Sequence, residues 1–197
     1  MAVESPLVKR FASAVNSLRL SYVARIHEAL YYEMPLNRRI EAAEKPRLPN
    51  RGSGAFQVDL AIGVEREDPG GAFFTPLLAI EFKTQLTTHD VITYSAKAIR
   101  TKQVYPWLRY GLIIEGGEMI PGRFFTHNQG LDFAVAAKGY LSEGKFAGFV
   151  RALVVGEAAL SDELERARGK NRSSTECYRS RKEFGRFGAL FRVQTTR

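Results

Sequence analysis

An apolar run that ends in charged residues is the feature that most constrains this chain. Residues 77–80 are all hydrophobic, and Glu81, Phe82 and Lys83 follow them directly. Alternate residues of a β-strand point to opposite faces, so Glu81 and Lys83 share one face of the predicted strand. Charges at the end of a buried strand cost free energy unless they are paired or bind an ion. The sequence therefore predicts either a structural ion pair or a functional site at this point.

A second strand is predicted upstream. Large apolar residues alternate with small or polar ones between Phe56 and Val64, the pattern of a half-buried strand. Asp59 falls on the face opposite the large apolar side chains. The turn signal Asp68-Pro69-Gly70-Gly71 predicts antiparallel pairing with the next strand, which runs from about Pro76 to Thr84. This hairpin would bring Asp59 to the charged face of that strand.

Hydrophobic periodicity predicts helices and further strands around this hairpin. The first helix would run from about Leu7 to Glu33 and stop before Pro35. A second would begin at Thr87, with Asp90 in its first turn, and end near Tyr105. The later elements expected are a buried, parallel strand at Tyr110–Ile114, a strand at Arg123–Thr126, and helices at Asp132–Ala137 and Glu143–Arg168. This order predicts an α/β fold in which helices flank a mixed β-sheet.

Basic residues are concentrated toward the C-terminus. The chain carries a net charge of +8, from 29 basic and 21 acidic residues. Residues 166–197 contain ten basic residues and two acidic ones, which accounts for the whole surplus. We therefore expect a single α/β domain at residues 1–165 and a basic extension at residues 166–197.

This concentrated charge favours contact with a polyanion such as nucleic acid, and a solvated basic tail is the alternative. The candidate nucleic-acid contacts are Arg38, Arg39 and Arg51 in a turn-rich loop, Lys97 on the second helix, and Arg179, Arg181 and Lys182 in the extension.

Composition also narrows the environment. No apolar run approaches the roughly 18 residues that span a bilayer, so we expect no membrane segment. Cys177 is the only cysteine, which excludes an internal disulfide and a cysteine-rich zinc site and fits a cytoplasmic protein. The three histidines, His27, His89 and His127, lack the spacing of metal ligands.

Asp59, Glu81 and Lys83 are residue types suited to phosphodiester hydrolysis. A hard divalent cation such as Mg²⁺ binds carboxylate oxygens, activates water and stabilises charge in the transition state. Asp59 and Glu81 would be its ligands, with the backbone carbonyl of Phe82 as a third. Lys83 would position the water or stabilise the phosphate, since two neighbouring carboxylates would hold it protonated.

The order of these motifs resembles the PD-(D/E)XK nuclease superfamily, which includes many restriction enzymes, junction resolvases and repair nucleases. The resemblance covers roughly residues 7–114: Asp59, a turn, then Ile80-Glu81-Phe82-Lys83, a capped helix and an apolar strand. It implies a restriction-endonuclease-like fold, α-β-β-(β)-α-β, with extra C-terminal helices. It also implies that Asp59 and the charged pair of the second motif are catalytic, with a first-helix glutamate, Glu28 in preference to Glu33, as an accessory metal ligand.

Two departures from the family pattern stand out. Val58 replaces the proline of the motif. The family core has three strands before its second helix, whereas the sequence indicates only two. We expect the missing strand near Arg47 or at Phe73-Phe74, which would otherwise extend the second strand.

The resemblance implies a Mg²⁺-dependent endonuclease that hydrolyses DNA, with Mn²⁺ as a substitute metal. Family members that cut both strands often dimerise, so it also implies a homodimer. Two alternatives remain open at this point. One is a catalytically silent nucleic-acid-binding module on the same fold, and the other is an RNA-directed nuclease or a subunit of a larger assembly.

Overall fold

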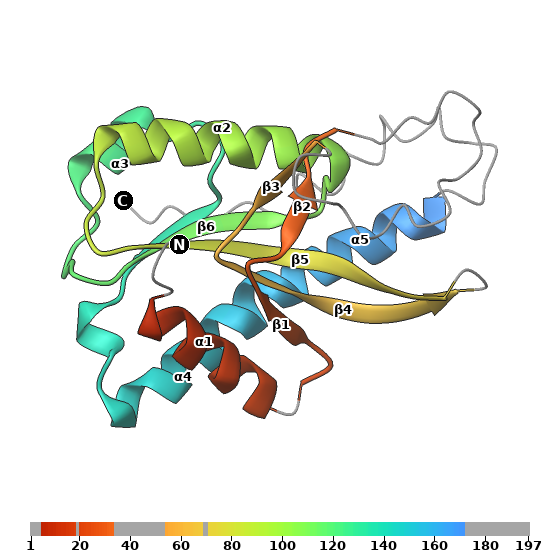
Figure 1. Cartoon of the computed structure of the whole chain (residues 1–197), viewed down its shortest axis with the longest axis horizontal. Coiled ribbons are helices and arrows are strands. Elements are labelled where there is room, and N and C mark those ends of the chain that lie inside the picture. Colours follow the sequence, from red (N-terminus) through yellow and green to blue (C-terminus); the bar gives the residue numbers. More distant parts are fainter. Residues whose placement is uncertain (1–4, 19, 34–53, 69–70, 172–197) are drawn as a thin grey trace, which may run out of the picture. The chain divides into compact units, whose positions relative to one another are not determined.

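A computed structural model describes residues 5–18, 20–33, 54–68 and 71–171 (Figure 1). The chain divides into two units, Met1–Asp162 and Glu163–Arg197. The second unit begins within the last helix, α5 (Ala159–Asn171). The sheets and the candidate site belong to the first unit.

A five-stranded mixed sheet forms the centre of the first unit. Its strand order is β1-β4-β5-β6-β7, made of β1 (Val23–Ile26), β4 (Leu60–Asp68), β5 (Gly71–Lys83), β6 (Arg109–Ile114) and β7 (Phe133–Ala136). β4 pairs antiparallel with both β1 and β5, whereas β5, β6 and β7 run parallel to one another. A separate two-stranded sheet pairs β2 (Ala29–Tyr31) with β3 (Ala55–Gln57). The predicted mixed α/β architecture and the buried, parallel strand β6 are confirmed.

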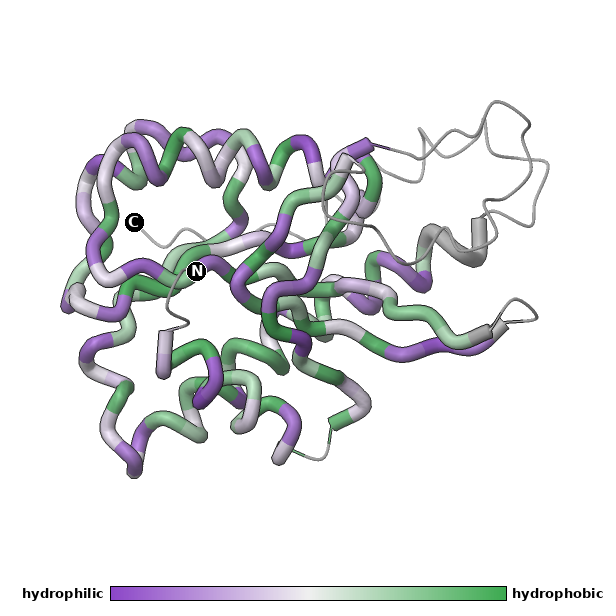
Figure 2. The backbone as a smooth tube through the Cα atoms, viewed as in Figure 1, coloured by the Kyte–Doolittle hydropathy of each residue, from purple (hydrophilic) through white to green (hydrophobic). Residues whose placement is uncertain are grey.

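Helices cover both faces of the large sheet (Figure 1). One face packs on α1 (Pro6–Ser17) and α4 (Glu143–Leu153), where Phe11 forms an edge-to-face contact with Phe82 at 5.7 Å between ring centroids. The other face packs on α2 (Thr88–Val104) and α3 (Gly122–His127). We call these two hydrophobic clusters the α1 core and the α2 core. Along α1 and α2 the tube in Figure 2 alternates between hydrophobic and hydrophilic residues, as expected for helices with one buried face.

The predicted hairpin of β4 and β5 is confirmed. The two strands pair antiparallel from Leu60 opposite Ile80 to Asp68 opposite Gly71, so Phe73-Phe74 extend β5 as expected. A β-bulge interrupts the register, because Ile62 pairs with Leu78 while Gly63 pairs with Pro76.

Leu77 is the extra residue of this bulge. It packs in the α1 core together with Leu78, whereas Ala79 packs in the α2 core. Strict alternation along the predicted strand would place Leu77 on the same face as Ala79, and the bulge is the physical reason that it lies on the other face.

Replacement of Gly63 by alanine is expected to lower the free energy of unfolding by about 3 kcal/mol. A Cβ atom at Gly63 would lie 2.1 Å from the backbone oxygen of Thr75, in the paired strand. Gly148→Ala in α4 is the matched control: a Cβ there meets nothing within 4 Å, and alanine favours a helix interior by about 1 kcal/mol. Urea denaturation of both variants measures the difference. Equal stability of Gly63→Ala and the wild type would contradict the close approach at the bulge.

The helix predicted from Leu7 to Glu33 is wrong beyond Ser17. α1 ends there, and the chain turns back to form β1 and β2. The side-chain oxygen of Asn16 accepts a hydrogen bond of 2.9 Å from the backbone of Ala24, which ties the helix end to β1. The apolar residues of β1 continue the helical spacing by coincidence, and no glycine or proline marks the boundary.

The strand predicted from Phe56 to Val64 is interrupted at Val58 and Asp59, where the chain leaves β3 and enters β4. Val58 packs in the α2 core, whereas Leu60 packs in the α1 core. The large apolar side chains therefore do not share one face. The bend at Asp59 separates the two sets.

Two later predictions are also wrong. Residues Arg123–Thr126 lie in helix α3, which follows Pro121, and Phe133–Ala136 form strand β7 rather than a helix. β7 is held by parallel pairing with β6, a tertiary contact that four residues of sequence do not reveal. The helix predicted at Glu143–Arg168 is confirmed, since α4 continues through a π-helical turn, η2 (Val154–Ala158), into α5.

Among the described residues, no helix combines the length and the hydrophobicity needed to cross a membrane.

Candidate active site

Asp59 and Glu81 are brought together by the pairing of β4 with β5. Leu60 pairs with Ile80 in this antiparallel pair. Asp59, which precedes Leu60, therefore lies beside Glu81, which follows Ile80. The backbone N–H of Phe82 donates a hydrogen bond of 2.8 Å to Oδ2 of Asp59. This contact fixes the Asp59 carboxylate at the end of β5, where the sequence predicts it.

Glu81 is a buried acid. Its residue is 2% exposed, and Oε1 accepts hydrogen bonds from the Tyr110 hydroxyl at 2.7 Å and from Nζ of Lys97 at 3.3 Å. Burial raises the pKa of Glu81 to about 7, with a further contribution from the Asp59 carboxylate, while Lys97 and Tyr110 oppose the rise. Glu81 therefore exchanges its proton close to neutral pH.

Lys83 lies on the same side of β5, facing α2. Its ammonium group is 3.7 Å from Oδ1 of Asp90 and 5.0 Å from the ring centroid of Tyr94. Burial alone would lower the pKa of Lys83, but the Tyr94 hydroxyl and the carboxylates of Asp90 and Asp59 outweigh it, and the net direction is upward. Lys83 is therefore protonated at neutral pH, as the sequence analysis expected of a lysine between carboxylates.

Helix α2 supplies three side chains that contact the charged residues of β5. Asp90, Tyr94 and Lys97 follow one another at positions i, i+4 and i+7, on one face of the helix. A capping box fixes the first turn, because Thr87 and Asp90 exchange side-chain and backbone hydrogen bonds. The cap at Thr87 was predicted from the sequence. That Asp90, Tyr94 and Lys97 face β5 was not predicted. The i, i+4, i+7 spacing was the available signal.

Lys97 has a partner that the sequence does not indicate. We expected it to contact nucleic acid, and in the structure its ammonium group forms an ion pair with Glu81. The same group lies 5.0 Å from the ring centroid of Tyr94 and 5.8 Å from that of Phe56. Contact of Lys97 with nucleic acid stays a prediction.

The two candidate accessory ligands lie outside α1, although the predicted helix included both. Glu28 follows β1, and its carboxylate is 3.7 Å from Arg25. Burial raises the pKa of Glu28 and Arg25 opposes the rise. Glu33 is exposed and pairs with Arg100 at 3.4 Å. Neither of these glutamates is on a helix, because the chain forms β1 and β2 instead.

The backbone of Glu28 nonetheless lies next to the site. Its carbonyl accepts a hydrogen bond of 2.9 Å from the N–H of Val58, and the N–H of His27 donates to the carbonyl of Asp59 at 3.1 Å. These two bonds hold the Asp59 bend in place. The remaining expected nucleic-acid contacts, Arg38, Arg39, Arg51, Arg179, Arg181 and Lys182, lie outside the described residues.

Within the described ranges, no group of three or more His, Cys, Asp and Glu side chains is arranged to hold a metal ion. Asp59 and Glu81 form a pair of carboxylates, and the Phe82 carbonyl adjoins them in the sequence. Their oxygens are the hard donors that Mg²⁺ prefers. A metal bound here would complete its coordination with water and with substrate oxygens.

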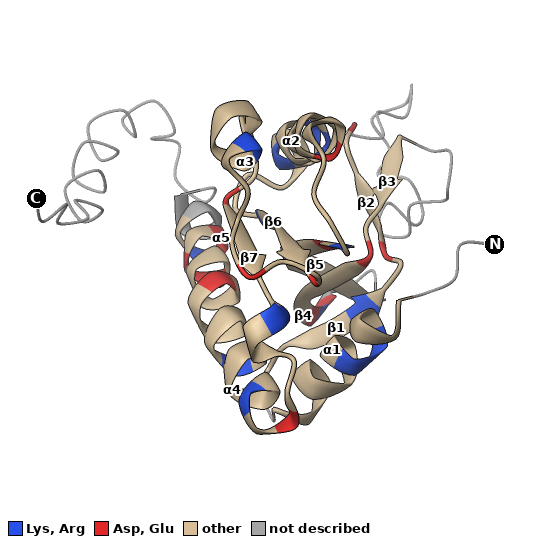
Figure 3. Cartoon of the chain, turned by 90° about the vertical axis from the view of Figure 1, so that its left-hand side faces the viewer, with Lys and Arg blue, Asp and Glu red and all other residues tan. Residues whose placement is uncertain are grey.

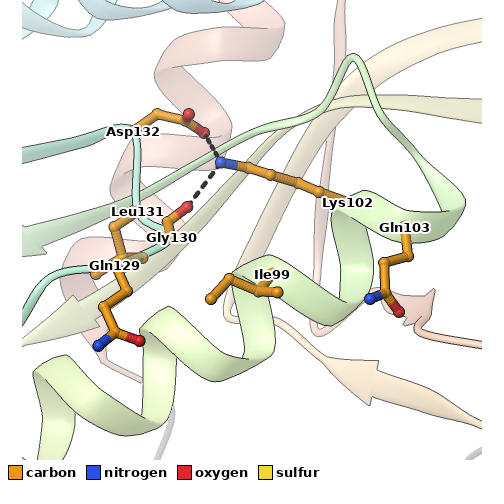
Figure 4. Close-up of a pocket in the computed structure, with 7 residues that line it drawn as sticks. All are labelled: Ile99, Lys102, Gln103, Gln129, Gly130, Leu131 and Asp132. Atoms are coloured by element: carbon orange, nitrogen blue, oxygen red, sulfur yellow. Dashed lines mark hydrogen bonds and ion pairs between the residues drawn. The ribbon is translucent and has the colours of Figure 1, made fainter.

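A hollow of about 460 Å³ lies away from this site, on the exposed side of α2 (Figure 4). Ile99 and Lys102 line it from the helix, and Asp132 closes it from the segment before β7. Lys102 donates to Asp132 at 2.6 Å and to the Gly130 carbonyl at 2.7 Å, while Asp132 also accepts from the backbone of Tyr110 at 2.6 Å. These charges brace the start of β6, so we assign the hollow a structural role.

No protein-family model matches this sequence, and no curated protein sequence matches it either.

Proposed function

We propose that this chain is a Mg²⁺-dependent endonuclease that hydrolyses DNA on a restriction-endonuclease-like core. The observation that carries the proposal is the convergence of Asp59, Glu81 and Lys83 at the ends of β4 and β5. Asp59 is tied to the strand by Phe82 N–H, and its charge influences the pKa values of both Glu81 and Lys83. Two carboxylates and a protonated lysine in mutual electrostatic range suit phosphodiester chemistry.

The order of the elements supports the same proposal. Between α1 and α2 the large sheet has three antiparallel strands, β1, β4 and β5, while β2 and β3 form the separate small sheet; the parallel strand β6 follows α2. The family pattern calls for three strands before the second helix. β1 supplies the strand that the sequence analysis expected elsewhere.

Asp59, Glu81 and the Phe82 carbonyl would hold the metal. The Glu81 carboxylate pairs with the Lys97 ammonium, and burial, with the Asp59 carboxylate, raises the pKa of Glu81 to about 7. When bound, a divalent cation lowers the pKa of water and neutralises charge on the phosphate. The donor set therefore fits the metal that the proposal requires.

The two lysines would have different tasks. Lys83, held protonated beside Tyr94 and Asp90, donates hydrogen bonds to a phosphate oxygen or to the attacking water. Lys97 pairs with the Glu81 carboxylate at 3.3 Å and would be available to a substrate phosphate where Glu81 holds a metal. Figure 3, which views α2 end-on, shows basic residues on this helix, and basic residues near the site favour contact with a polyanion.

A plasmid cleavage assay tests the proposal. The wild-type protein is expected to cut DNA with Mg²⁺ or Mn²⁺ and to leave it intact with EDTA. Lys83→Ala is expected to reduce the rate by about 100-fold or more, because one positioned donor contributes about that much to transition-state stabilisation. Lys138→Ala, at an exposed lysine paired with Glu118, is the matched control and should cut at the wild-type rate. Undiminished cutting by Lys83→Ala would remove that residue from the mechanism.

One observation favours a second candidate, a nucleic-acid-binding module without catalysis. Glu81 is already satisfied by Tyr110 and Lys97, which is also how a purely structural buried acid is stabilised. This candidate predicts salt-dependent DNA binding and no cleavage with any divalent metal. The same assay separates the two.

A further inference from the structure

Two aromatic rings lie beside the candidate active site. Tyr32, just after β2, and Phe56, in β3, have ring centroids 4.2 Å apart with their planes inclined by 31°. Both residues are partly exposed. The pair therefore presents aromatic surface to solvent on the small two-stranded sheet, rather than filling a core.

Helix α2 places two cations against these rings. The guanidinium of Arg100 lies 4.7 Å from the centroid of Tyr32, and the ammonium of Lys97 lies 5.8 Å from the centroid of Phe56. Rings that bind bases by stacking, flanked by cations that bind the backbone phosphates, are the usual means of holding a single nucleic-acid strand.

Arg100 can reach a phosphate at little cost. Its ion pair with Glu33 is 3.4 Å long, and both side chains are more than half exposed, at 53% and 64%. Exposed pairs of this kind contribute roughly 1 kcal/mol or less to stability. The guanidinium can therefore exchange Glu33 for a phosphate, and this movement would uncover the Tyr32 ring for a base.

Lys97 connects the aromatic pair to the carboxylates. One ammonium group contacts both the Phe56 ring and Glu81. A strand whose phosphate lies at Glu81 would therefore carry a neighbouring base to the Phe56 and Tyr32 rings. In a fully paired duplex that base is stacked inside the helix and is not available to them.

We propose that Tyr32 and Phe56, with Arg100 and Lys97, form a stacking subsite for an unpaired nucleobase next to the scissile phosphate. The inference rests on the proposed function for the identity of that phosphate. It assigns the substrate class: DNA with a single-stranded segment, such as an overhang or a flap, in preference to continuous duplex.

Fluorescence anisotropy in EDTA tests the subsite without any cleavage. The probes are a labelled single strand, the matching blunt duplex, and the same duplex with a single-stranded overhang. The wild type is expected to bind the single strand and the overhang at least about 10-fold more tightly than the blunt duplex. Tyr32→Ala and Phe56→Ala should each weaken single-strand binding by roughly 10-fold and change duplex binding by less than about 2-fold.

Matched variants separate stacking from folding. Tyr140→Ala removes a ring from the stacked Tyr140–Phe149 pair, 5.1 Å between centroids, and should leave DNA binding unchanged. Phe56→Trp keeps an aromatic face and should retain the single-strand preference, even if Phe56→Ala fails to fold. Loss of that preference in Phe56→Trp, or its full retention in folded Phe56→Ala and Tyr32→Ala, would overturn the subsite.

The subsite and the proposed function can fail separately. The binding measurements need no metal and decide the subsite alone. Cleavage of DNA by a wild type that shows no single-strand preference would leave the nuclease proposal standing and remove the subsite. Single-strand preference without cleavage in Mg²⁺ or Mn²⁺ would support the subsite and remove the nuclease.

Discussion

Glu81→Gln is expected to reduce Mg²⁺-dependent DNA cleavage by about 1000-fold. The change replaces a carboxylate by an amide of the same shape, which removes one negative charge from the proposed metal position. Charge stabilisation by a bound metal is worth several kcal/mol in the transition state, and each 1.36 kcal/mol is a factor of ten in rate. The amide oxygen can still accept the hydrogen bond from the Tyr110 hydroxyl, which is 2.7 Å from Oε1 in the wild type.

The control for this variant is Glu118→Gln. It makes the same chemical change at an exposed carboxylate, which pairs with Lys138 at 2.9 Å on the surface. Its cleavage rate should equal that of the wild type. Single-turnover rates with saturating enzyme separate a chemical defect from weak binding. A wild-type rate for Glu81→Gln would show that the acid is structural and that the proposed metal position is wrong.

The hairpin and the orientation of its charges could be predicted from the sequence. The turn at residues 68–71 and the two-residue period around Glu81 depend only on local geometry, which a single sequence contains. The predicted face of Leu77 was wrong because a bulge adds one residue to β5, and nothing in the sequence marks its position.

The elements that were missed depend on tertiary contacts. β1 has four residues whose hydrophobic spacing also suits a helix, and its pairing with β4 decides the outcome. β7 forms in the same way against β6. Short segments carry little intrinsic preference, so the neighbouring strand selects their conformation. Because β1 was predicted as part of a helix, Glu28 and Glu33 were also predicted to be helical, whereas the structure places them on either side of β2.

The partners of the charged residues could be predicted only in part. Asp90 was predicted to lie in the first turn of a helix, but its contact with Lys83 depends on which face of α2 lies on the sheet. Tyr110 was assigned to a buried strand, and its hydroxyl reaches Glu81 because β6 pairs in parallel with β5, where Leu112 lies opposite Glu81. Local pattern predicts the faces of single elements, while the packing of two elements determines which side chains meet.

The stability of the metal-free protein is expected to fall as the pH rises from about 4.5 to 7, because of Glu81. Burial raises the pKa of this carboxyl from 4.5 to about 7. Between these values the folded protein keeps a proton that the unfolded chain releases, so rising pH favours unfolding. Relative to Glu81→Gln, the wild type should lose about 3 kcal/mol of unfolding free energy between pH 4 and pH 8. Urea denaturation in EDTA at several pH values measures this loss.

Comparison with Glu118→Gln isolates the effect of burial. The Lys138 ammonium lowers the pKa of Glu118, so that carboxylate stays ionised in both states above its ordinary value. Its replacement should leave the pH dependence between pH 5 and 8 unchanged. A difference between wild type and Glu81→Gln that does not vary with pH would contradict a buried, titrating acid.

Magnesium should reverse this loss in the wild type alone. A cation that binds the ionised Glu81 stabilises the folded state by about 1–3 kcal/mol at 10 to 100 times its Kd, and binds more weakly at pH 5, where it must displace a proton. The thermal midpoint at pH 8 should therefore rise with Mg²⁺ in the wild type and stay constant in Glu81→Gln. Equal stabilisation of both proteins would place the metal elsewhere. Because the measurement contains no DNA, it tests the metal position independently of cleavage. For a catalytically silent module that binds no metal, Mg²⁺ would leave the thermal midpoint of both proteins unchanged.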